Sequence, residues 1–121
     1  MKKNCRISNH MKQLIDYEVK TKGIKHGELY REILNSFINV YELNGGERGY
    51  IDFINREYLL FMTDKYNGAN ISHKYITINL YKQQYNMYIG ICKDFPKYKV
   101  RLFELACFYY FNIIPAKLRW T

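Results

Sequence analysis

The sequence has 121 residues, which suits one domain and excludes two large independent ones. Hydrophobic residues make up 48% of it and aromatic residues 17%, which excludes a disordered or low-complexity chain. With 19 Lys and Arg against 11 Asp and Glu the formal charge is +8, so nucleic acid or an acidic protein is the expected partner. No apolar run reaches the ~18 residues of a membrane span. The charged start is also unlike a signal peptide, so we expect a cytoplasmic protein that does not contact membranes.

The first part of the chain alternates and then becomes helical. Residues 2–7 predict a short strand that places Lys2, Asn4 and Arg6 on one face. Apolar residues at helical spacing predict a helix over 8–21, with Ser8 as its cap and Gly23 at its end. A stronger apolar stripe predicts a second helix that begins near residue 26 and runs to 41.

The rest of the chain repeats this order after an extra element. Residues 50–66 predict an amphipathic helix whose role the sequence does not reveal. The best strand pattern covers residues 75–81, with Thr77 and Asn79 pointing outward. Two further helices are predicted, one over about 82–93 and one over 100–114 that Pro115 ends.

Two short stretches rich in glycine or asparagine, typical of turns and linkers, divide the chain into three segments. They fall at the Gly45-Gly46 pair and at residues 67–70, which gives segments 1–46, 47–72 and 73–121. The first segment carries 8 Lys and Arg and 5 Asp and Glu (+3), the second 3 and 4 (−1), and the third 8 and 2 (+6). Both outer segments are therefore basic and the connecting segment is not.

The outer segments share one pattern of strand, helix and helix. An offset of 73 residues superposes the strands and the last helices, so that Leu29 matches Leu102. For the middle helix an offset of 74 fits better and matches Leu14 with Tyr88, which predicts one inserted residue near its first turn. Residue identity is very low, so only the pattern repeats.

Each outer segment resembles a ribbon-helix-helix unit of the MetJ and Arc repressor superfamily. The resemblance rests on the Gly23-Ile24 turn with the Glu28-Leu29-Tyr30 helix start, and on the strand Ile76-Thr77-Ile78-Asn79-Leu80. Pro96-Lys97 departs from the family turn, and Gly27 and Val100 replace its small hydroxyl residue. The tandem arrangement is similar to transcription regulators of archaeal filamentous viruses, which implies the cytoplasm of a host cell.

The resemblance implies an α+β protein in which two tandem units form one antiparallel ribbon that enters the major groove of double-stranded DNA. Since Arg, Lys and Asn are the side chains that read base edges, the expected base-reading residues are Lys2, Asn4, Arg6, Thr77 and Asn79. Backbone amides at the start of each second helix would clamp phosphates at His26, Gly27, Lys99 and Val100. The tail residues Arg119 and Trp120 would contact either DNA or the core. Association of chains on the DNA, side by side or head to tail, is left open.

The residues do not favour catalysis or cofactor binding. The Gly45–Gly49 stretch lacks the Lys-Ser/Thr of a P-loop, and no histidine lies in a motif with a nucleophile, so we expect no enzyme and no small-molecule substrate. The histidines and cysteines have no metal-ligand spacing, and each of the three cysteines lies on an apolar stripe typical of core: Cys5, Cys92 and Cys107.

Two alternatives to a transcription regulator stay open. One is a protein-binding inhibitor or antitoxin-like module whose basic surface meets an acidic partner. The other is an accessory factor in phage or plasmid DNA processing. Steep salt dependence of duplex binding favours the DNA-binding hypotheses, and a stoichiometric protein complex without DNA favours the inhibitor.

Overall fold

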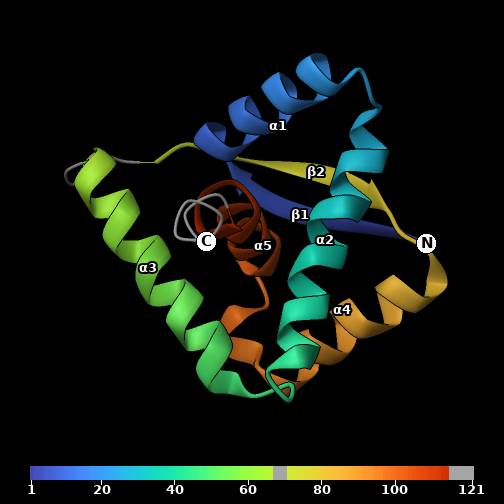
Figure 1. Cartoon of the computed structure of the whole chain (residues 1–121), viewed down its shortest axis with the longest axis vertical. Coiled ribbons are helices and arrows are strands. Elements are labelled where there is room, and N and C mark those ends of the chain that lie inside the picture. Colours follow the sequence, from blue (N-terminus) through green and yellow to red (C-terminus); the bar gives the residue numbers. More distant parts are fainter. Residues whose placement is uncertain (67–70, 115–121) are drawn as a thin grey trace.

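The computed structural model describes residues 1–66 and 71–114 and has the predicted α+β class. One two-stranded antiparallel sheet packs on a mostly helical body (Figure 1). The elements in chain order are β1 Lys2–Ser8, α1 Asn9–Lys22, α2 His26–Leu43, α3 Arg48–Tyr66, β2 His73–Asn79, α4 Lys82–Asp94, the 3₁₀ turn η1 Pro96–Tyr98, α5 Leu102–Phe108 and the π-helix η2 Tyr109–Ile113.

The two strands form an intrachain ribbon, as predicted, with β1 antiparallel to β2. Lys2 lies opposite Asn79 at one end, and Ser8 lies opposite His73 at the other. The strand predicted over 75–81 lies two residues earlier in the chain, because Tyr81 serves as the N-cap residue of α4 and the chain leaves the ribbon before it.

Sequence signals at the ends of α1 are confirmed. The side chain of Ser8 accepts a hydrogen bond from the backbone amide of Met11 at 3.2 Å, which satisfies one of the unpaired amides of the first turn. Gly23 ends the helix with φ +67°, a left-handed conformation that costs glycine little. These two residues fix where α1 leaves the ribbon and where the chain turns toward α2.

The core lies between the ribbon and the helices. Cys5, Ile7 and Ile78 point inward from the ribbon and are buried. Every residue of α5 is buried, and this helix contacts α1, α2, α3 and β1. In Figure 1 α5 lies at the centre of the view, with α3 on one side and α2 on the other.

All three cysteines are free and buried, as the apolar stripes predicted. Burial raises the pKa of the Cys5 thiol to about 11, although its hydrogen bond with Tyr88 opposes the shift. Cys107 is also fully buried, and its pKa is raised well above its ordinary value for the same reason. The thiols therefore stay protonated and serve as small apolar side chains.

The last predicted helix differs from the structure at both ends. It was expected over 100–114, but the chain first makes tight turns in which Lys99 N–H donates to Pro96 O and Arg101 N–H to Tyr98 O. The α-helix therefore begins at Leu102, and after Phe108 it widens into the π-helix η2. Pro115, Arg119 and Trp120 lie outside the described residues.

Candidate nucleic-acid interface

The ribbon gathers the predicted base-reading residues on one face. Since side chains alternate along a strand, the face opposite the buried Cys5 and Ile7 carries Lys2, Asn4 and Arg6 from β1. The register places them beside the corresponding residues of β2, which are Asn79, Thr77 and Tyr75. Sequence reasoning had not assigned a role to Tyr75, which is 75% exposed and the most accessible aromatic side chain of this face.

Hydrogen bonds order this face. Thr77 Oγ1 donates to Asn4 Oδ1 at 2.8 Å across the middle of the ribbon. A guanidinium nitrogen of Arg6 lies 3.1 Å from Nδ1 of His73. At the other end the amino group of Met1 donates to Asn79 Oδ1 at 3.2 Å. Four polar side chains of the face are thus held in place before any partner binds, which lowers the conformational entropy that binding would cost.

Two pairs of residues separated by 73 positions touch each other. Asn4 lies opposite Thr77 in the ribbon and bonds to it. Tyr30 of α2 packs against Phe103 of α5 with ring centroids 5.8 Å apart in an edge-to-face arrangement. A residue contacts its own counterpart only close to a two-fold axis, so both pairs have the geometry of a two-fold axis that passes through the ribbon and the α2–α5 contact.

The same offset also relates the middle helices, which corrects the expected insertion. α1 begins at Asn9 and α4 at Lys82, 73 residues later. Met11 and Ile15 are buried in α1, and their counterparts at this offset, Gln84 and Tyr88, are buried in α4. The better fit at 74 came from matching apolar types, whereas the α4 position equivalent to Met11 holds a buried glutamine.

The ends of the ribbon are held by counterpart contacts of different chemistry. At one end Glu104 of α5 accepts hydrogen bonds from Ser8, the cap of α1. The equivalent residue of α2 is Arg31, whose guanidinium lies over the ring of Tyr81, the cap of α4, at 5.1 Å from the ring centroid. Arg31 also donates to Asn79 O at 3.3 Å. The helix α5 therefore binds the end of β1 through a carboxylate, and α2 binds the end of β2 through a guanidinium.

Glu104 is the most consequential residue that sequence reasoning missed. Its side chain is 2% exposed and accepts three hydrogen bonds, from Ser8 N–H at 2.9 Å, Ser8 Oγ at 2.6 Å and Tyr58 Oη at 2.9 Å. Burial raises the pKa of Tyr58 and the Glu104 charge raises it further, so this hydroxyl stays protonated and donates. The carboxylate joins β1, α3 and α5 at one point.

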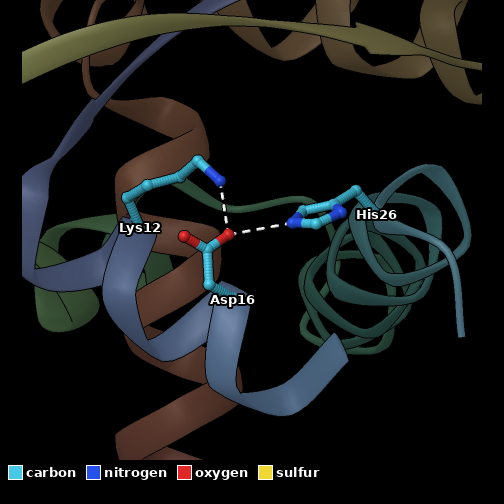
Figure 2. Close-up of polar contacts among 3 residues, drawn as sticks. All are labelled: Lys12, Asp16 and His26. Atoms are coloured by element: carbon cyan, nitrogen blue, oxygen red, sulfur yellow. Dashed lines mark hydrogen bonds and ion pairs between the residues drawn. The ribbon is translucent and has the colours of Figure 1, made fainter. Parts of the chain in front are cut away.

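The predicted phosphate clamp in the first half has an acidic neighbour (Figure 2). His26 is the first residue of α2, and its Nε2 lies 2.8 Å from Asp16 Oδ1 on α1. Lys12 donates to the same oxygen. The hydrogen bond from Lys12 is the largest cause of the lowered pKa of Asp16, and His26 lowers it further. A carboxylate of α1 thus lies against the first residue of α2 and is also bonded to Lys12.

In the second half the predicted clamp residues lie before the helix rather than in its first turn. α5 begins at Leu102, so Lys99 and Val100 belong to the preceding turns. The amide of Lys99 already donates to Pro96 O at 3.2 Å. What this end offers to an anion is the charge of exposed side chains, since Lys97, Lys99 and Arg101 cluster within five residues.

The fold and this face define a small α+β protein with an exposed, basic two-stranded ribbon. Comparison of the chain with protein-family models, with curated proteins and with solved structures gave no match. Among residues 1–66 and 71–114 no helix is long and apolar enough to cross a membrane. Within the same residues no three His, Cys, Asp or Glu side chains are grouped to hold a metal ion.

Proposed function

We propose that the chain is a tandem ribbon-helix-helix regulator of transcription that reads the major groove of double-stranded DNA with the β1–β2 ribbon. The observation that carries the proposal is the outward face of this ribbon, where donors from both halves of one chain stand side by side. The paired contacts at an offset of 73 support the tandem arrangement, because ribbon-helix-helix dimers place their two-fold axis through the ribbon.

The dimensions of the ribbon suit a major groove. Seven residue pairs at a rise of about 3.3 Å give a ribbon of roughly 20 Å, and a two-stranded ribbon fits a groove about 12 Å wide. In this binding mode Arg6 and Lys2 donate to guanine O6 and N7, and Asn4 and Asn79 bind adenine. Tyr75 and Thr77 would contact thymine methyl groups or the sugar-phosphate backbone.

Phosphate binding would flank the ribbon on both sides. On one side the first amides of α2, at His26 and Gly27, point along the helix axis, and no side chain among the described residues caps them. On the other side the basic turn before α5 supplies Lys99 and Arg101 in place of helix amides. The +8 charge of the chain would steer it to DNA and make binding depend steeply on salt.

Selection of duplexes from a random pool, followed by footprinting over a range of protein concentrations, tests the proposal. We expect a recovered sequence whose smallest protected unit is not palindromic, because the outward face takes the cationic Lys2 and Arg6 from β1 but the neutral Thr77 and Asn79 from β2. Affinity should fall steeply between 50 and 200 mM salt. Failure to enrich any sequence would contradict the proposal. A strictly palindromic smallest unit would show that strands of two chains pair on DNA instead of β1 with β2.

Removing the carboxylate beside the predicted phosphate clamp is expected to strengthen duplex binding. Asp16→Asn should raise duplex affinity severalfold, because Lys12 and the α2 N-terminus lose a competing carboxylate. The cost in stability should stay below about 1 kcal/mol, as for exposed ion pairs. Asp64→Asn on α3 makes the same change of net charge at another exposed site and serves as the control. Equal gains in both variants, measured by fluorescence anisotropy at low salt, would assign the effect to net charge alone.

A second candidate function rests on the outer face of α3. Phe53 and Leu60 are exposed there, which favours a protein-binding inhibitor or antitoxin-like module. An accessory role in DNA processing would use the same ribbon as the proposed regulator. A stable stoichiometric complex with a protein in the absence of DNA, lost in Leu60→Asp but retained in Arg6→Ala, would favour the inhibitor.

A further inference from the structure

A cavity of about 530 Å³ opens beside the end of the ribbon where Ser8 pairs with His73. It lies between α3, the ribbon and the turn before α5. Its volume falls within the range of small-molecule sites in proteins, roughly 300–1,000 Å³. The helix α3, for which the DNA-binding proposal has no role, forms one of its walls.

The charge of the lining favours an anion. Three side chains in it are cationic, Arg6 from the ribbon, Lys97 from η1 and Arg101 from the cap of α5, and Glu104 is the only carboxylate that the described lining contains. Both oxygens of Glu104 already accept hydrogen bonds from Ser8 or Tyr58. The lining therefore carries a net charge of +2 from these groups, and its carboxylate is screened from the cavity by its own donors.

The rest of the lining favours a flat, apolar body. Tyr58 and Tyr66 contribute aromatic rings, and Leu59 and Met62 contribute aliphatic surface, all from α3. An arginine can bind both the anionic group and the flat body of such a ligand, because its guanidinium makes bidentate hydrogen bonds to phosphate and also stacks on planar rings. Arg101 lines the cavity and is fixed by a 3.0 Å hydrogen bond from its Nη1 to Asn55 Oδ1 of α3.

We propose that this cavity binds a small aromatic anion of the nucleoside monophosphate class. The apolar wall of α3 receives the aromatic body, and Arg6, Lys97 and Arg101 receive the anionic group. Because Arg6 also belongs to the outward face of the ribbon, an occupied cavity holds this side chain away from the major groove. The ligand therefore weakens duplex binding. This effect on DNA rests on the proposed function, whereas the binding of the ligand to the cavity is independent of it.

Calorimetric titration of the whole chain without DNA tests the cavity. The probes are the four ribonucleoside 5′-monophosphates, the matching nucleosides and inorganic phosphate at constant ionic strength. We expect at least one monophosphate to bind once per chain, tenfold or more tighter than both its nucleoside and inorganic phosphate. If every monophosphate binds no tighter than inorganic phosphate, the proposal is wrong.

Variants locate the binding. Arg101→Ala should weaken the monophosphate at least tenfold, and Thr63→Trp, which fills the cavity from an exposed position of α3, should do the same without removing a charge. Arg56→Ala removes an exposed arginine of α3 outside the lining and should change the affinity less than twofold. Equal losses in Arg101→Ala and Arg56→Ala, or none in Thr63→Trp, would overturn the assignment.

The link to DNA is tested separately, on the duplex recovered by selection. A saturating monophosphate should weaken duplex binding at least fivefold in the unaltered chain and less than twofold in Thr63→Trp. If the monophosphate binds but duplex affinity does not change, Arg6 is not shared and the link is wrong. If no duplex is selected at all, the proposed function fails while the titration still decides on the cavity.

Discussion

Glu104→Ala is expected to lower the free energy of unfolding by about 3–5 kcal/mol. The change removes the acceptor of three buried hydrogen bonds and leaves the Ser8 amide, the Ser8 hydroxyl and the Tyr58 hydroxyl without it. Each buried polar group left unsatisfied costs about 1–3 kcal/mol, and bonds to a charged acceptor are stronger than neutral ones. Urea denaturation followed by circular dichroism measures the change.

Two further variants make this prediction specific. Glu42→Ala, at an exposed position near the end of α2, removes the same charge and should change stability by less than about 0.5 kcal/mol. Tyr58→Phe removes one donor and leaves the carboxylate with two, so a loss of about 1 kcal/mol is expected. If Glu104→Ala is no more costly than Glu42→Ala, the carboxylate does not join β1, α3 and α5.

The elements were predictable where the pattern is local. The alternation of Asn4 and Arg6 with the buried Cys5 and Ile7, and the capping signals at Ser8 and Gly23, depend on residues close in sequence. The pairing of β1 with β2 spans about 70 residues and came from the family resemblance, not from either strand. The tandem arrangement itself stays a prediction, which the paired contacts at an offset of 73 support.

The environment of the site was harder to predict because its partners are distant in sequence. Glu104 bonds to Ser8 and to Tyr58 across separations of 96 and 46 residues. One signal was present, since Glu104 is the only ionisable carboxylate in the apolar run from Leu102 to Phe108 and all its neighbours in that run are buried. A carboxylate at such a position must find donors inside the core, but which donors depends on how α3 and α5 pack.

The cavity beside the ribbon was not predictable for the same reason. Arg6 lies in β1, whereas Lys97 and Arg101 lie far later in the chain, so no local pattern places the three in one site. They converge because the turn before α5 packs beside the end of the ribbon, and α3, whose role the sequence analysis left open, forms the other wall of the cavity. The outward residues of the ribbon were easier, because a two-stranded ribbon with one buried face leaves its other face exposed.

Arg6→Ala is expected to weaken binding to the selected duplex by about 1–3 kcal/mol and to relax specificity at one base position. The stability of the protein should change little, because the side chain lies on the outward face of β1 and hydrogen-bonds to the exposed His73. Arg56→Ala on α3 removes an equal charge away from the ribbon and should reduce affinity slightly and uniformly for all sequences. Binding is measured by gel shift with no nucleotide added, because Arg6 also lines the cavity.

Arg6→Lys separates base reading from charge. Lysine keeps the positive charge but not the planar fork that matches guanine O6 and N7, so affinity for random duplex should stay close to that of the unaltered chain while the preference for the selected sequence falls. If Arg6→Lys keeps full specificity, Arg6 acts as a point charge on the backbone, and the direct readout moves to its neighbours on the face, Asn4 and Asn79. If Arg6→Ala itself leaves the affinity and the specificity unchanged, this end of the ribbon does not enter the groove. A guanidinium that contacts base edges could not be removed without a loss of binding.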